Sequence, residues 1–177
     1  MFNMKKIIII GNYDLEDKDG LKTIAMQTTG LRVDSMLYIN DQGSCPDKKL
    51  VKNELREELY SDQYDEDSLK ISVKEAFNGN DAAKILLEYL KKKWDKDTVI
   101  YYYEPHDDFF EYITDKSNEI DCRVHICDYY DIFNGKPSKD IYTIMEENNL
   151  NIKNMLKDSY VSLAYFLSAL VELMLSR

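Results

Sequence analysis

Cysteine is scarce in this chain: only Cys45, Cys122 and Cys127 occur among its 177 residues. So small and odd a number does not make a disulfide framework, and the N-terminal residues do not have the pattern of a signal peptide. Because disulfides persist mainly in oxidising compartments, the sequence predicts a protein of the reducing cytoplasm. On an alternating strand Cys122 would point away from His125 and Cys127, so a zinc site is not predicted there.

Positive charge is also in deficit, since 23 lysines and arginines face 33 aspartates and glutamates, for a formal charge of −10. A phosphate backbone would be repelled by such a surface, so extended nucleic-acid binding is not expected. The most apolar segment, residues 160–175, is interrupted by Ser162, Ser168 and Glu172. It is also shorter than the roughly 20 residues that span a bilayer. We therefore expect a buried helix and no membrane contact.

A glycine-rich phosphate loop is missing as well. Neither GxGxxG nor GxxxxGK[ST] follows the first apolar run, Lys5 to Ile10. Those motifs place backbone amides around a dinucleotide or a triphosphate, so binding of those kinds is not indicated. The segment from Asp17 to Gly20 fails as a calcium loop, because Leu15 and Met26 would stand at ligand positions. No cofactor and no metal ion is predicted.

What the sequence does contain is an alternation of apolar strands and amphipathic helices. The first run is rich in β-branched residues, which is typical of a central strand covered on both faces. Leu21, Ile24, Ala25 and Thr28 have helical spacing, and Gly30 suits a helix C-cap. The expected strands cover 5–10, 33–39, 69–74, 99–103 and 123–127; the expected helices cover 20–29, 46–59, 78–90, 109–113, 139–147 and 159–175.

This order predicts an α/β fold: a Rossmann-like three-layer domain with a mostly parallel five-stranded sheet and extra C-terminal helices. We expect residues 1–135 to form the Rossmann-like domain. Residues 136–177 would be a helical extension that packs on the same domain. A chain of this length buries an adequate core without disulfides or structural metals.

Ligands of open parallel sheets bind beyond the C-terminal ends of the strands. Two polar loops are therefore candidates, Gly11 to Asp19 after the first strand and Glu104 to Asp108 after the strand at 99–103. His106 titrates near neutral pH and is a candidate acid or base, with Asp14 as a second catalytic candidate. The aspartates of both loops would also suit a divalent cation, although loop aspartates often only cap helices.

The N-terminal half resembles the CARF domain (CRISPR-associated Rossmann fold), in particular that of the ancillary ribonucleases of type III CRISPR systems. The resemblance is carried by Lys6 to Asp14, by Asp19-Gly20-Leu21, and by Val33 to Asn40 as the next strand. The loop at Glu104 to Asp108 diverges from the family's small-residue turn. The catalytic arginine and histidine of the attached ribonuclease domain have no counterpart in this chain.

The resemblance implies a cytoplasmic homodimer in antiviral defence that binds a small cyclic nucleotide, a cyclic oligoadenylate, across its two-fold axis. Some such domains cleave the ring, so the resemblance also implies a ring nuclease or another phosphodiesterase. The ligand-binding residues carried over by the resemblance are Gly11, Asn12, Tyr13 and Asp14, with Asn40 at the next strand end. The second loop adds the candidates Glu104, Pro105, His106, Asp107 and Asp108, because the family also binds its ligand with the loop after the fourth strand.

Two alternatives stay open. PIN-like metal-dependent ribonucleases have a similar element order, and their acidic positions correspond approximately to Gly11 or Asp14, Asp81 or Ala83, and His106 or Asp108. A non-catalytic dimeric interaction scaffold is the other alternative. It would assemble through Phe166, Leu170 and Leu173 of the C-terminal helix.

Overall fold

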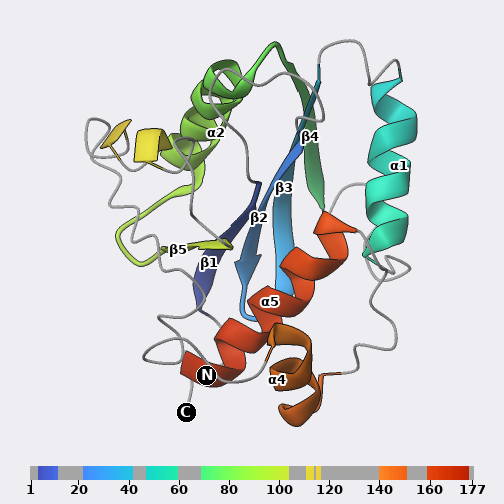
Figure 1. Cartoon of the computed structure of the whole chain (residues 1–177), viewed down its shortest axis with the longest axis vertical. Helices are drawn as coiled ribbons and strands as arrows, with labels where there is room; N and C mark the ends of the chain where they lie inside the picture. The colour runs from blue at the N-terminus through green and yellow to red at the C-terminus, as the bar shows by residue number, and fades with distance from the viewer. Residues whose placement is uncertain are drawn as a thin grey trace.

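An open five-stranded sheet with strand order β4-β3-β2-β1-β5 forms the centre of the structure (Figure 1). The computed structural model describes residues 4–11, 22–41, 47–59, 69–103, 111–113, 115–116, 140–150 and 159–175. The strands are β1 (Lys5–Ile10), β2 (Lys22–Thr29), β3 (Arg32–Asp41), β4 (Lys70–Ala76) and β5 (Val99–Tyr103). The helices are α1 (Lys48–Glu58), α2 (Gly79–Lys93), α4 (Ile141–Glu147) and α5 (Tyr160–Leu175).

β1 is the central strand that its isoleucine run predicts. It pairs antiparallel with β2 and parallel with β5, and Ile7, Ile8 and Ile9 are fully buried. Odd-numbered isoleucines contribute to the core under α2, while even-numbered ones contribute to the core under α5. Both faces of the strand are thus covered, which explains why its sequence is continuously apolar.

The expected helix at 20–29 is wrong, because residues 22–29 form strand β2. β2 joins β3 through a tight turn in which Gly30 has a φ of 60°, a value that favours glycine. Ile24 and Met26 face one core and Ala25 faces the other, so apolar residues on both faces of a strand gave a spacing that resembles a helix. β2 runs antiparallel to both neighbours. The sheet is therefore mixed, and the expectation of a mostly parallel sheet is wrong.

Two helices that the sequence predicted connect the later strands: α1 connects β3 to β4, and α2 connects β4 to β5. α1 begins after Asp47, whose carboxylate accepts hydrogen bonds from the amides of Lys49 and Leu50. α2 begins after Asn78, whose side chain accepts from the amide of Asp81, while the Asp81 carboxylate accepts from the amide of Phe77. This reciprocal capping fixes the start of α2. The expected strand at 123–127 lies outside the described residues.

Helices cover both faces of the sheet. α2 packs on one face, and α1 and α5 lie on the other, with α4 contributing Ile141, Ile144 and Met145 to the same core (Figure 1). The buried helix expected at 159–175 is confirmed as α5. Phe166 and Leu170 are buried within the chain, so these two side chains belong to the core and do not offer a surface for scaffold assembly.

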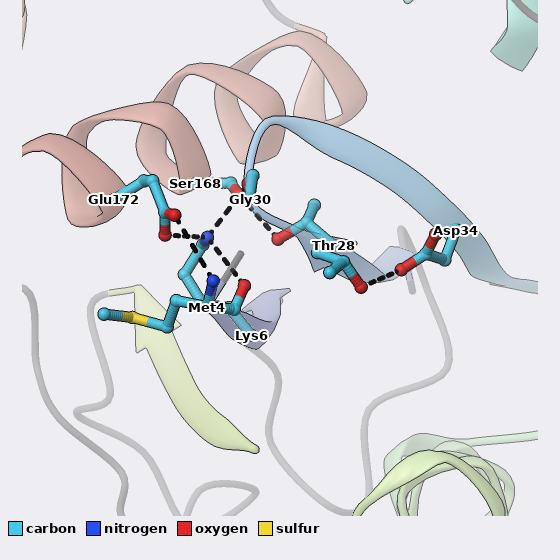
Figure 2. Close-up of polar contacts among 8 residues, drawn as sticks. Met4, Lys6, Thr28, Gly30, Asp34, Ser168 and Glu172 are labelled. Atoms are coloured by element: carbon cyan, nitrogen blue, oxygen red, sulfur yellow. Dashed lines mark hydrogen bonds and ion pairs between the residues drawn. The ribbon is translucent and has the colours of Figure 1, made fainter. Parts of the chain in front are cut away.

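A buried ion pair fastens α5 to the start of β1. Lys6 Nζ lies 2.7 Å from Glu172 Oε2, and both side chains are 0% exposed. The Lys6 ammonium also donates to the carbonyls of Gly30 (3.0 Å) and Met4 (3.3 Å), and Glu172 Oε1 accepts from the Met4 amide (Figure 2). Burial lowers the pKa of Lys6, while the hydrogen bond and charge of Glu172 act in the opposite direction. Because the charges are paired and hydrogen-bonded, the site tolerates them in the core.

We predict that Lys6→Met lowers the free energy of unfolding by about 3–5 kcal/mol, because it leaves the Glu172 carboxylate buried without its cation. The double variant Lys6→Met/Glu172→Leu should recover most of that loss, since no buried charge remains. Urea unfolding followed by circular dichroism measures both. A double variant as unstable as the single one would show that the loss comes from the hydrogen bonds of Lys6 to the Met4 and Gly30 carbonyls rather than from an unpaired charge.

Candidate functional site at the strand ends

The chain adds strands first on one side of β1 and then on the other, so β1 is a switch point in the strand order. The chain passes from β1 through β2 and β3 to β4 at one edge, and then returns to β5 on the other side of β1. β1 and β5 are parallel, and Ile10 lies beside Tyr103 at their C-terminal ends. In open α/β sheets, a ligand binds outside the strand ends at such a switch point. The two predicted loops, Gly11 to Asp19 and Glu104 to Asp108, follow these two adjacent strand ends in the sequence.

Of the predicted site residues, the structure describes two. Gly11 lies directly after β1 and is buried, and Asn40 lies near the C-terminal end of β3 and is partly exposed. The remaining ones lie outside the described residues: Asn12, Tyr13, Asp14, Glu104, Pro105, His106, Asp107 and Asp108. The candidate catalytic pair, Asp14 and His106, belongs to this second group.

Gly11 makes room for a threonine that the sequence did not single out. A Cβ atom at Gly11 would lie 2.7 Å from Thr23 Oγ1 and 3.2 Å from Thr23 Cγ2, which is too close for a side chain. Thr23 itself is fully buried. Its hydroxyl has no hydrogen-bond partner within the part of the chain that the structure describes. A buried hydroxyl without a partner costs stability, so Thr23 calls for a partner that the described residues do not supply.

Sequence reasoning missed Thr23 because it placed this segment on a helix. A signal was present: in β2, Thr23, Ala25 and Gln27 alternate with the apolar residues Ile24 and Met26. Read with the period of a strand, that pattern puts Thr23 on the same face as Ala25. Ala25 belongs to the core under α2, as do Ile7 and Ile9 of β1, so Thr23 and Gly11 share that face.

Asn40 does not join them. Along β3, Asn40 alternates with Ile39 and shares a face with Tyr38, which packs in the core under α1 and α5. Its side chain lines a cleft there together with Lys22, and its Oδ1 accepts a hydrogen bond from the Asp41 amide at 2.9 Å. The structure thus separates Gly11 and Asn40, which the sequence placed in one site, onto opposite faces of the sheet.

Two of the positions assigned to the PIN-like acidic residues, Asp81 and Ala83, have structural roles in α2. Asp81 caps α2 through the Phe77 amide, and Ala83 is fully buried. Within the described ranges, no group of three histidine, cysteine, aspartate or glutamate residues is arranged to hold a metal ion. The described part of the chain therefore offers no acidic triad to this reading.

Comparisons with known proteins do not classify this chain, so its class is defined by the fold alone. A scan against protein-family models and searches of curated proteins and of solved structures give no match. Among the described helices, none has the length and apolar character needed to cross a membrane. The class that the structure defines is an α/β protein with an open mixed sheet and helices on both faces.

We predict opposite effects for two threonine substitutions on β2. Thr23→Val removes a hydroxyl without a partner at nearly constant shape, so the free energy of unfolding should rise by about 1 kcal/mol. Thr28→Val is the matched control, because its hydroxyl lies 2.8 Å from Ser168 Oγ in the core and its loss should destabilise the fold by about 1 kcal/mol. Urea unfolding compares the two. Equal destabilisation would mean that the Thr23 hydroxyl has a partner within the fold.

Proposed function

We propose that this chain is a sensor domain that binds a small nucleotide at the switch point between β1 and β5. The observation that carries the proposal is the buried Thr23 hydroxyl beside Gly11 at that edge, which has no hydrogen-bond partner among the described residues. A hydroxyl in this position donates one hydrogen bond and accepts two, so it can bind a phosphate, ribose or base atom. The stability lost by burying it is recovered when the ligand supplies the partner.

We further propose that the fold is a variant of the Rossmann-like class. Its two crossover helices support this, since α1 lies on one face of the sheet and α2 on the other, as in doubly wound folds. In this variant a strand, β2, stands where such folds place the first crossover helix. The switch point is kept, with the C-terminal ends of β1 and β5 side by side.

The identity of the nucleotide rests on the resemblance to CARF domains. It makes the ligand a cyclic oligoadenylate, bound across a homodimer in the cytoplasm, and links the protein to type III CRISPR defence. Gly11, Asn12, Tyr13 and Asp14 would contribute from the first loop, and residues 104–108 from the second. Ring cleavage, if the domain catalyses it, would use Asp14 or His106, which lie on these two loops.

We predict that isothermal titration calorimetry with cyclic tetra- and hexa-adenylate detects binding of one of them, with one ring for two chains. Thr23→Val and Asp14→Ala should weaken binding about tenfold or more, because each removes a hydrogen-bonding group from the site. Thr28→Val should bind as the unchanged protein does, since its hydroxyl lies in the opposite core.

Absence of heat with either ring at high micromolar concentration would overturn the oligoadenylate assignment. Equal affinity of Thr23→Val and the unchanged protein would overturn the proposed place of the site. Linear oligoadenylates of the same length serve as a comparison, and their equal binding would show that the ring is not what is recognised. Chromatography of the ring after incubation, with His106→Ala as the control, tests cleavage separately.

A further inference from the structure

A cleft of about 240 Å³ opens on the face of the sheet opposite Thr23, between α1 and α5. β2 and β3 contribute its floor near the C-terminal end of β3. α1 forms one wall and the start of α5 contributes the other. The cleft is lined by Lys22, Ile24, Tyr38, Asn40, Val51, Glu54, Leu55, Glu58, Tyr160 and Val161.

The strand side of the cleft carries hydrogen-bond donors. Lys22 Nζ lies 5.4 Å from the ring centroid of Tyr160 and 6.0 Å from that of Tyr38, so two aromatic rings hold the ammonium by cation–π attraction. Asn40 is next to it, since Lys22 and Asn40 are directly paired residues of β2 and β3. The Asn40 Oδ1 accepts a hydrogen bond from the Asp41 amide, so the side-chain NH₂ of Asn40 is the group that could donate to a ligand. An ammonium and an amide NH₂ together suit a carboxylate.

The helix side carries the opposite charge. Glu54 and Glu58 are four residues apart on α1 and therefore project from the same face. Burial raises the pKa of Glu58; the hydrogen bond with Ser159 and the charge of Lys22 lower it, and Glu54 raises it further. The cleft is therefore polarised, with the Lys22 ammonium on the strand side and the two carboxylates on the helix side. A ligand ammonium would pair with the carboxylates.

We propose that this cleft binds a free α-amino acid, with its carboxylate at Lys22 and Asn40 and its ammonium at Glu54 and Glu58. The volume supports a ligand of that size, since sites for drug-sized molecules occupy about 300–1,000 Å³. Val51, Leu55 and Val161 supply an apolar part of the lining, so the side chain of the amino acid is apolar. A nucleotide phosphate does not fit, because two carboxylates would repel it.

The test adds each of the common amino acids to the full chain at about 10 mM, a concentration that detects millimolar affinity. Binding is measured by the melting temperature and by amide chemical shifts. Apolar amino acids should raise the melting temperature and shift the amides of β2, β3 and α1. The same compounds without the carboxylate, as amines, or with an acetylated nitrogen should fail. Equal binding of either derivative, or no effect of any amino acid, would overturn the proposal.

Variants locate the site. Glu58→Gln and Lys22→Met should each weaken amino-acid binding about tenfold, because each removes one charged partner of the zwitterion. Glu57→Gln is the matched control: Glu57 is the preceding residue on α1, is exposed, and does not line the cleft. An equal loss in Glu57→Gln would place the effect in the net charge of α1 and would also overturn the proposal. Glu58→Gln should leave oligoadenylate binding unchanged, so failures of the two proposals are distinguishable.

Discussion

The ion pair between Lys6 and Glu172 is the contact on which the arrangement of the layers depends. It joins the first strand to the last helix, residues at opposite ends of the chain, and it also reaches the turn between β2 and β3 through the Gly30 carbonyl. Two charges with no solvent exposure are stable in the core only when they remain paired, so a displacement of α5 along the sheet would leave both charges without their partner. The same helix forms one wall of the cleft, because its first residues, Tyr160 and Val161, line it.

The two faces of the sheet differ in what their polar groups do. Under α2, Ser35 lies between Gln27 and the Tyr89 hydroxyl, so these groups satisfy one another, whereas the Thr23 hydroxyl near the strand ends lacks a partner among the described residues. Under α1 and α5, Thr28 pairs with Ser168 and Lys6 pairs with Glu172 near the start of β1, while the charged groups of the cleft lie near the end of β3. The two candidate sites therefore lie toward the C-terminal ends of β1 and β3, where functional sites of open sheets are found.

Much of the fold follows from local sequence. The isoleucine run of β1, the alternation of exposed and buried residues in β4, and the caps at Asp47 and Asn78 each act over a few residues, and the expected ranges of these elements overlap those in the structure. The segment at 22–29 was not predicted as a strand, because Ile24, Ala25 and Thr28 also have helical spacing. That spacing concealed the alternation of Thr23 and Gln27 with Ile24 and Met26. Because of that error, the sequence predicted a mostly parallel sheet, whereas the sheet in the structure is mixed. The same error also hid Thr23, whose relation to Gly11 exists only when β2 lies beside β1.

The hairpin geometry of β1, β2 and β3 also bears on how the chain acquires its structure. These strands contact near neighbours in sequence, so their pairing closes short loops and has a low entropic cost, whereas β5 and α5 join from far along the chain. The Lys6 ammonium is desolvated when α5 packs on the sheet, because Glu172 lies on that helix. Removal of α5 from the sheet therefore separates two opposite charges in the core.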